Sequence, residues 1–324
     1  MKTYRIERAG LEVSRIAYGC MQLSTAWDDQ PLSAAERTRT QAMVEAALAN
    51  GINLFDHADI YARGKGERLF GELLNRRSSL RQQIILQSKC GIRLAGDPRT
   101  GSPQRYDFSH DYLLGAVDGI LRRLGTDRLD VLLLHRPDPL VQPEEVARAF
   151  DTLRRSGKVR HFGVSNHSAS QIALLQRALD VPLVVNQVEL SLLHHALVSD
   201  GLLANQQGAA CMGAATTLDY CRQHDIRIQA WSPLAGGRLG RPLQQVEAPL
   251  LAAAHCLQRI AAEHGVSTEA VMLAWLLRHP AGIQPVLGTT SPSRLADSCQ
   301  ADALELSREH WYELLQASRG APVP

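Results

Sequence analysis

Eight short apolar runs, each followed by a longer helical or amphipathic segment, recur along nearly the whole chain. They lie at 14–20, 52–58, 84–89, 129–135, 159–166, 183–190, 226–232 and 283–289. Strands that alternate with helical segments are typical of parallel sheets whose strands are joined by crossover helices. Because eight such strands close a barrel, we predict an α/β fold of the (β/α)8 TIM-barrel type.

The segments between the runs support this prediction. In 34–51 apolar residues recur every three or four positions and Gly51 follows as a stop signal, and 143–157 and 168–179 are also helical in pattern. A doubly wound sheet is the alternative, but no GxGxxG motif follows the first run. The opening "TYRIERAGLEVSRI" predicts a β-hairpin that turns at Ala9-Gly10 and caps the barrel's bottom.

No linker or internal repeat divides the sequence, so we expect residues 1–324 to form a single barrel domain. Two stretches, 93–107 and 203–217, are predicted to be long loops at the carboxyl ends of strands, where lids and pocket walls are often found. The second of these, rich in Gly and Ala, resembles an insertion.

Composition excludes several classes of function. The chain has 324 residues and a formal net charge of +2, which gives no electrostatic footprint for nucleic acid or for an acidic membrane. There is no uninterrupted apolar run long enough to span a membrane, and the opening residues lack the apolar core of a signal peptide. Six cysteines are scattered without a CxxC pair, so we expect reduced thiols in a cytoplasmic protein. No heptad pattern or obvious apolar patch predicts an oligomeric state.

Polar residues gather where the predicted strands end. In a barrel these positions face one shared site at the carboxyl ends of the strands. A lone Lys or His at such a position is more often a surface or rim residue, so the argument depends on the set. The set comprises Asp56, Lys89, His135, Ser165, Asn166, Gln187, Glu189, Trp231 and Ser232, with Tyr61 in the loop after the second strand.

Four of these residues can form a proton-transfer site. A tyrosine has an ordinary pKa near ~10, and a neighbouring ammonium lowers it, so Lys89 would make Tyr61 a better acid. Asp56 would keep that ammonium charged and in place. His135 could then donate a hydrogen bond to a substrate carbonyl as it becomes an alkoxide.

These residues also carry a resemblance to a known family. The Asp56–Tyr61 spacing, the strand-ending Lys89, "LLLHRPDP", "GVSN", "NQVE", "WSPLAGGRL" and "PVLGTTSPSRLADS" resemble the aldo-keto reductases in type and order, over roughly residues 15 to 300. "HADIYARGKGE", "SKCG" and "HRPDP" look most like a bacterial oxidoreductase branch of that family. The resemblance implies a (β/α)8 carbonyl reductase that uses NADPH rather than NADH. In it Tyr61 is the general acid, Lys89 and Asp56 activate it, and His135 orients the carbonyl.

The resemblance also implies a set of cofactor-binding residues. Ser165, Asn166 and Gln187 would hold the nicotinamide carboxamide, and Trp231 would stack on the nicotinamide ring. Segment 232–239, with Ser232, Leu234, Gly237 and Arg238, would pass along the pyrophosphate. Segment 288–298, with Gly288, Thr289, Ser291, Arg294 and Ser298, would begin the last helix, with Ser291 and Arg294 near the 2′-phosphate. This chain departs from the family pattern with His57 after the aspartate, with Asp297-Ser298 in place of a Glu-Asn pair, and with no lysine beside Arg294.

Two rival functions remain open from the residues. His57 and Asp59 alternate to the same side of the strand, and with His135 they could form the ligands of a metal-dependent hydrolase. That role would leave Tyr61 and Lys89 without a function, and we favour a site without metal. The second rival keeps the barrel as a cofactor-binding redox sensor without turnover. The presence of all four catalytic residue types favours an enzyme.

The expected partner is a small-molecule carbonyl substrate. Its pocket should contain Tyr61 and His135, be walled by loops 21–32, 90–107 and 191–217, and have Trp27 as an aromatic wall.

Overall fold

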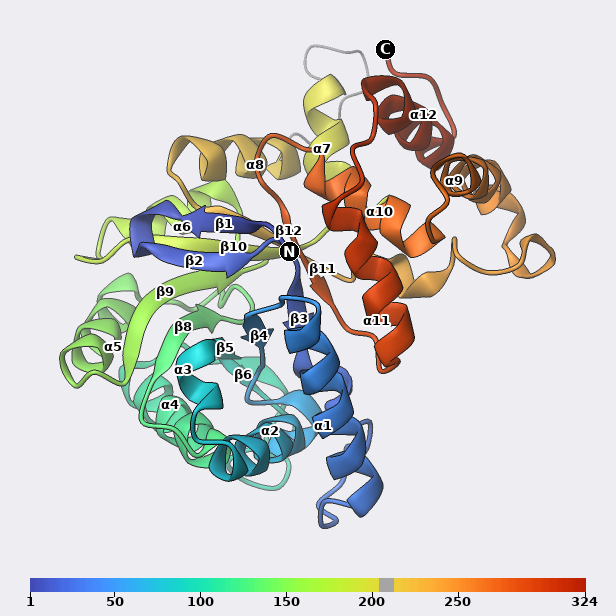
Figure 1. Ribbon diagram of the computed structural model, residues 1–324. Helices are drawn as coiled ribbons and strands as arrows, with labels where there is room; N and C mark the ends of the chain where they lie inside the picture. Colours follow the sequence, from blue (N-terminus) through green and yellow to red (C-terminus); the bar gives the residue numbers. More distant parts are fainter. Residues whose placement is uncertain (204–212) are drawn as a thin grey trace.

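Eight parallel strands close a barrel in the computed structural model, which describes residues 1–203 and 213–324 (Figure 1). In barrel order they are β3 (Ala17–Gly19), β4 (Leu54–Asp56), β5 (Ile85–Cys90), β8 (Leu129–Leu134), β9 (Val159–Ser165), β10 (Leu183–Glu189), β11 (Arg227–Trp231) and β12 (Gln284–Leu287). Seven of them lie within the predicted apolar runs and β5 extends beyond its run, 84–89, only by Cys90, so the predicted fold class is confirmed. Of the predicted inserted loop, 203–217, residues 204–212 lie outside the described residues. The prediction is wrong for 213–217, which form the start of helix α8 (Gly213–Gln223).

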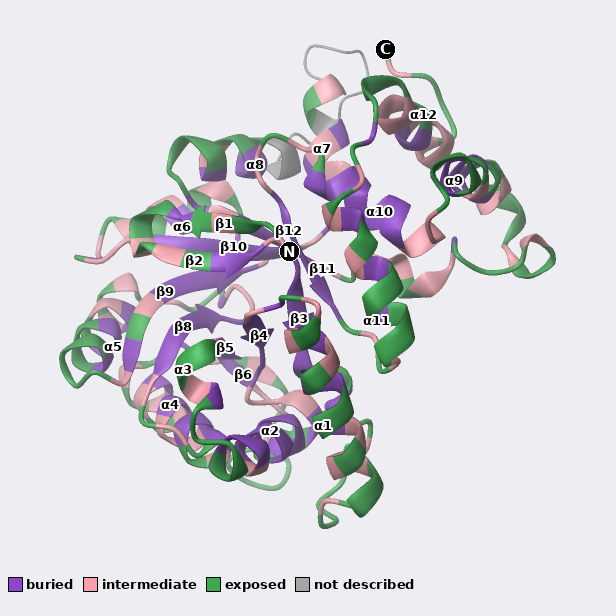
Figure 2. Cartoon of the chain, viewed as in Figure 1, coloured by how far each residue is buried: buried purple, intermediate pink, exposed green. Residues whose placement is uncertain are grey.

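Helices surround the strands (Figure 1). They are α1 (Ala34–Ala49), α2 (Lys65–Arg76), α3 (Leu80–Gln83), α4 (His110–Leu124), α5 (Pro143–Arg155), α6 (Ala169–Gln176), α7 (Ala196–Ser199), α8 (Gly213–Gln223), α9 (Leu251–His264), α10 (Thr268–Leu277), α11 (Pro292–Cys299) and α12 (Arg308–Arg319). Figure 2 shows the strands almost wholly buried and the outer helix faces exposed. Apolar runs without alternation follow from this burial on both faces.

Local signals explain where helices begin and end. Ser33 and Glu36 form a capping box at the start of α1, and Ser168 and Gln171 form another at α6. Gly51, with a φ of 77°, turns the chain out of α1, as its stop signal predicted. The predicted helices 34–51, 143–157 and 168–179 correspond to α1, α5 and α6.

The N-terminal hairpin closes the bottom of the barrel as predicted. Strand β1 (Thr3–Ile6) pairs antiparallel with β2 (Leu11–Ser14) around Gly10, whose φ is 64°. Ile6 and Val13 are buried in a cluster with side chains from the barrel strands, Leu54 and Val131 among them. The hairpin therefore seals the lower interior with apolar side chains, which leaves the opposite end for polar groups.

Two details differ from the sequence prediction. The 93–107 stretch is not only a loop, because β6 (Ile92–Arg93) and β7 (Arg105–Tyr106) form a small antiparallel sheet at its ends. Segment 288–298 leads into α11, but α11 is not the last helix, since α12 follows it. Among the described helices, none is both long and apolar enough to cross a membrane.

Candidate active site

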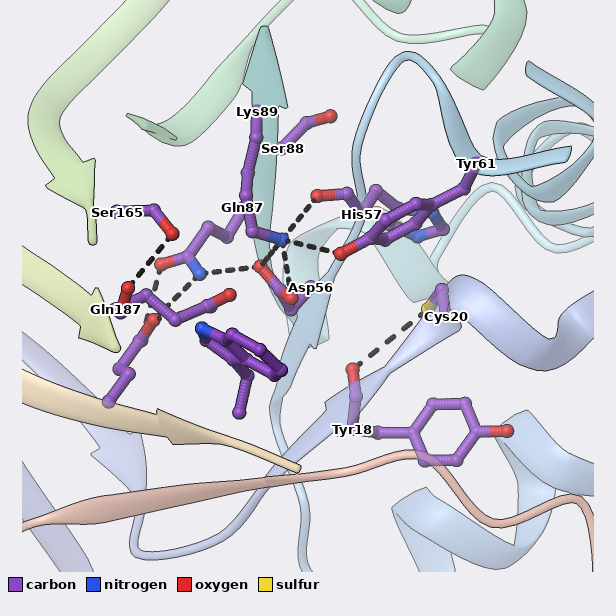
Figure 3. A network of polar contacts seen from close by, with 12 residues as sticks. Tyr18, Cys20, Asp56, His57, Tyr61, Gln87, Ser88, Lys89, Ser165 and Gln187 are labelled. Atoms are coloured by element: carbon purple, nitrogen blue, oxygen red, sulfur yellow. Dashed lines mark hydrogen bonds and ion pairs between the residues drawn. The ribbon is translucent and has the colours of Figure 1, made fainter. Parts of the chain in front are cut away.

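The four predicted catalytic residues meet at the carboxyl ends of neighbouring strands. Lys89, on β5, donates hydrogen bonds to Asp56 Oδ1 and Oδ2 at 2.8 and 2.7 Å, and to Tyr61 Oη at 3.1 Å (Figure 3). It also donates to the backbone oxygen of His57 at 2.9 Å. The His135 ring packs edge-to-face with the Tyr61 ring, with centroids 5.9 Å apart. One ammonium therefore joins the carboxylate to the phenol.

Tyr61 is held by an unusual stretch of backbone. Ala62 and Arg63, directly after it, have φ values of 47° and 54°, and Gly64 follows at 80°. Left-handed conformations cost non-glycine residues roughly 1–2 kcal/mol each. Among the described residues, six non-glycine residues have positive φ, and five flank this site: Ala62, Arg63, Asn166, Ser232 and Ala235. The strain is therefore concentrated where side chains must be aimed.

The pKa of Tyr61 shifts in the opposite direction from the sequence prediction. Burial raises the pKa of the Tyr61 phenol, and the Lys89 ammonium, which lowers it as expected, does not overcome this. Burial also opposes the charge on Lys89, but Asp56 and Tyr61 outweigh it and the pKa of the ammonium is raised. At neutral pH the tyrosine is therefore a phenol and the lysine a cation, the forms that a proton donor and its activator need.

His135 is neutral in this setting. Burial, followed by the charges of Lys89 and Arg136, lowers its pKa well below the ordinary value. Its backbone N–H donates to the Cys90 oxygen at 2.8 Å, which fixes the residue beyond the end of β8. A neutral imidazole can donate one N–H to a carbonyl oxygen without placing a second cation beside Lys89.

Beneath the site, buried glutamines cross the barrel. Gln87 on β5 donates to Asp56 Oδ1 at 2.6 Å (Figure 3). It also donates to Gln229 Oε1 at 2.8 Å. Gln229, on β11, donates to Gln284 and accepts from Gln187 at 3.0 Å. Strands β5 and β11 lie on opposite walls of the barrel. These hydrogen bonds thus connect Asp56 with Gln187, which was predicted to bind the cofactor.

A cavity of about 650 Å³ opens above these groups. Its lining includes Asp56, Tyr61, His135 and Trp27 of the predicted catalytic and substrate residues, and also Ser165, Asn166, Gln187, Trp231, Ser232, Leu234, Gly237, Gly288, Thr289 and Arg294 of the predicted cofactor residues. Arg238, Ser291 and Ser298 do not line it. Arg238 pairs with Glu247, Ser291 caps α11, and Ser298 is buried.

The inner part of the cavity suits a nicotinamide. Trp231 Nε1 donates to Asn166 Oδ1 at 3.0 Å, which holds the indole in a fixed plane, and Asn166 Nδ2 donates to Ser165 Oγ at 2.8 Å. Gln187 is buried, and its Oε1 accepts no hydrogen bond from any described residue, which leaves one acceptor for a carboxamide N–H.

The outer part suits phosphate groups. Gly236 and Gly237 have φ values of 67° and 74°, and a Cβ at Gly288 would meet nothing within 4 Å, so the backbone leaves room there. Arg294 lies in the first turn of α11, where helix N–H groups favour anions, and it pairs with Glu269 at 2.9 Å. These residues fit a dinucleotide.

The alternative metal site is not assembled. Among the described residues, no three His, Cys, Asp or Glu side chains converge as metal ligands would. His57 packs edge-to-face on Phe70 at 4.7 Å, burial lowers its pKa to about 3, and neither ring nitrogen has a hydrogen-bond partner. Asp59 is a separate buried carboxyl whose pKa burial raises.

Other residues of the cavity were predicted only as part of a segment or not at all. Met21, Gln22 and Ile92 lie in the predicted wall loops 21–32 and 90–107, and Pro233, Gly236 and Thr290 lie in the predicted cofactor segments. Sequence reasoning missed the remaining lining residues, which are Gly19, Ile60, Arg136, Val286 and Leu287. Arg136 had a usable signal, because it directly follows His135 at the same strand end. Gln87 had a weaker one, as a polar residue two positions before Lys89 in the same strand.

The fold and the site together define a (β/α)8 barrel in which a buried lysine–aspartate pair is hydrogen-bonded to a tyrosine at the carboxyl ends of the strands. The aldo/keto reductase family model matches residues 15–319, and the chain therefore belongs to this family. It is an NAD(P)H-dependent oxidoreductase, as the sequence predicted. Aldo/keto reductases use NADP(H), which confirms the predicted cofactor.

The chain is similar in sequence to named relatives over nearly its full length. It is 38% identical to a 6-dehydroglucose reductase of Agrobacterium fabrum and 36% identical to the oxidoreductase YdhF of Escherichia coli, each over 97% of both chains. The structure of an aldo/keto reductase from Klebsiella pneumoniae in complex with NADP and acetate is similar, with a TM-score of 0.72, 26% identity and coverage of 100% of this chain and 97% of that one.

Proposed function

We propose that this protein transfers a hydride from NADPH to an aldehyde or ketone, and that Tyr61 donates the proton. The observation that carries the proposal is the contact between Lys89 Nζ and Tyr61 Oη at 3.1 Å, with Asp56 holding the same ammonium. Because an ammonium can only donate, the phenol oxygen accepts in this contact. The Tyr61 O–H therefore stays available for a substrate oxygen in the cavity.

The chain's own groups would act in a fixed order. The neutral His135 and Tyr61 would both donate to the substrate oxygen and place the carbonyl carbon over the nicotinamide, which supplies the hydride when bound. As charge develops on the oxygen, Tyr61 would give up its proton, and Lys89 would stabilise the phenolate that remains. Asp56 would keep Lys89 charged throughout.

We assign the cofactor contacts by the same argument. Asn166 and Gln187 would hold the carboxamide, Trp231 would carry the ring, and the backbone at Gly236 and Gly237 would lie along the pyrophosphate. Arg294 would pair with the 2′-phosphate, which gives the preference for NADPH over NADH. Because the similar Agrobacterium fabrum protein is named a 6-dehydroglucose reductase, hydroxylated aldehydes are the first substrates to test.

The test is the substitution Tyr61→Phe, which removes only the phenol O–H. We expect the rate of NADPH oxidation with an aldehyde to fall by at least about 100-fold, as is typical for loss of a general acid, while NADPH binding measured by tryptophan fluorescence is unchanged. A variant that keeps its rate within a few-fold of the parent would refute the role of Tyr61. Equal catalytic efficiencies with NADPH and NADH in the parent would refute the cofactor preference.

A further inference from the structure

One charged side chain in the cavity has no charged partner. Of the charged residues that line the cavity, Asp56 is bonded to Lys89 and Arg294 to Glu269. The Arg136 guanidinium makes no hydrogen bond or ion pair with any residue that the structure describes, and it lies over the Trp231 ring, 5.4 Å from the centroid. A guanidinium carries five N–H donors in a planar fork, so this is a large unused donor capacity.

The position of Arg136 links it to the reacting carbonyl. It directly follows His135, so the two Cα atoms are about 3.8 Å apart. Its charge is close enough to contribute to the lowered pKa of His135. Arg294 and the open backbone at Gly236 and Gly237 provide another place for the cofactor phosphates, so these do not require Arg136.

The nearest carboxylate along the chain does not compensate Arg136. Asp138 is buried, and both of its oxygens accept backbone N–H groups, Oδ2 from Phe108 at 3.1 Å and Oδ1 from Leu140 at 2.9 Å. Leaving a half-buried cation unpaired beside Lys89 costs stability. A ligand that supplies hydrogen-bond acceptors to the Arg136 guanidinium would offset this cost.

We propose that Arg136 selects substrates with two neighbouring oxygen atoms close to the carbonyl, which its guanidinium binds as a fork. The proposal rests on the proposed carbonyl reduction at Tyr61 and names the substrate class for that site. The two oxygens belong either to a vicinal diol or to a carboxylate. Trp27 and Gln22, on the same cavity lining, add an aromatic face and an amide that suit a short hydroxylated chain.

The test compares aldehydes that differ only in these oxygens. D-Glyceraldehyde and propanal have the same three-carbon skeleton with and without the diol, and glyoxylate carries a carboxylate beside its carbonyl. Catalytic efficiency with NADPH is measured for the parent, for Arg136→Met, which keeps the length of the chain, and for Arg136→Lys, which keeps the charge without the fork. Arg177→Met, an exposed arginine outside the cavity, is the matched control. Because each aldehyde is compared with itself across variants, its hydration in water cancels.

We expect Arg136→Met to lower the efficiency with glyceraldehyde or glyoxylate by about 10- to 100-fold, as for loss of a charge-assisted contact, and with propanal by less than about twofold. Arg136→Lys should fall between these values for the preferred substrate. The substrate with the larger loss identifies the source of the oxygens. A larger loss with glyceraldehyde indicates a diol, and a larger loss with glyoxylate indicates a carboxylate.

Three results would overturn the proposal. Equal losses for propanal, glyceraldehyde and glyoxylate would mean that Arg136 supports the site without recognising substrate. A raised KM for NADPH with unchanged selectivity would place Arg136 in the cofactor site. No loss with any aldehyde would mean that it binds nothing that reacts. In all three the parent still reduces propanal in a Tyr61-dependent way, so the proposed function stands, whereas a parent that reduces no aldehyde would end both.

Discussion

Gln87 offers a test of whether the barrel interior affects Tyr61, the proposed proton donor. Its amide is fully buried, donates to Asp56 Oδ1 at 2.6 Å and exchanges two hydrogen bonds with Gln229 at 2.8 and 3.2 Å. The substitution Gln87→Met replaces the amide with an apolar side chain of similar length. It removes one donor from a buried carboxylate and opens the cross-barrel connection without creating a large void.

The magnitude follows from these contacts. A hydrogen bond to a charged group contributes about 1.5–3 kcal/mol and a neutral one about 1 kcal/mol, and the buried thioether recovers part of this. We therefore expect Gln87→Met to lower the free energy of unfolding by about 2–4 kcal/mol. Gln284→Met is the matched control, because Gln284 bonds Gln229 at 2.9 Å and the Ser14 oxygen at 2.6 Å but does not touch Asp56.

Both Gln87→Met and Gln284→Met should lower the free energy of unfolding, but only Gln87→Met should lower the catalytic rate. Without the Gln87 donor, the Asp56 carboxylate interacts more strongly with the Lys89 ammonium. The ammonium then stabilises the Tyr61 phenolate less. Because Lys89 lowers the pKa of Tyr61, weakening its effect raises that pKa. We expect kcat for reduction to fall about tenfold, and the alkaline limb of the pH–rate profile, where the phenol deprotonates, to move to higher pH.

The assay is urea unfolding with steady-state reduction of an aldehyde between pH 6 and pH 11 for the parent and both variants. Gln284→Met should lose stability while keeping its kcat and its alkaline limb. If both glutamine variants lose kcat equally with unmoved pH profiles, general loosening of the barrel explains the data. If Gln87→Met keeps the parent's kcat and profile, the contact with Asp56 has no catalytic role and the reasoning is wrong.

Two further predictions concern the cofactor and acid stability. Arg294→Ala should raise KM for NADPH at least about tenfold and leave KM for NADH within twofold, because only NADPH carries the phosphate proposed for this arginine; equal changes in steady-state kinetics would remove it from that role. His57→Phe should reduce the loss of stability in acid. Burial lowers the pKa of His57 to about 3 against an ordinary 6.5. The stability that the neutral His57 contributes is therefore complete above pH 6.5 and is lost as the pH falls toward 3. Between pH 7 and pH 5 the parent should lose about 2 kcal/mol more than His57→Phe in urea unfolding, and parallel losses would show that His57 is not the group responsible.

The barrel was predictable because its strands carry a strong local signal. A strand buried on both faces, such as Leu129–Leu134, is apolar at every position except Asp130, whatever its partners are. Strands β6 and β7 have only two residues each, too few for any periodicity, so the 93–107 stretch was predicted as a loop. Arg105 is a polar member of such a pair and carries no strand signal of its own.

The rim of the site was predictable for a topological reason. Once eight strands are parallel, each side chain just past a strand end faces the same opening, and Asp56, Lys89 and His135 occupy such positions. The distances between these side chains depend on how the barrel closes, and no local sequence pattern predicts them. The net direction of the Tyr61 pKa shift was missed for the same reason, since burial, which outweighs Lys89, arises only when the barrel is closed.

The glutamines show most clearly what a local pattern omits. Gln87, Gln229 and Gln284 are polar residues within strands, and a polar residue in a strand is as compatible with a solvated face as with the interior. Inside the barrel an unpaired amide would cost about 1–3 kcal/mol. These positions are therefore stable only together, because Gln229 lies across the barrel from Gln87 and beside Gln284. Their hydrogen bonds reach Asp56 at one end and Gln187 at the other, so the interior of the barrel joins the carboxylate that holds Lys89 to the proposed cofactor contact.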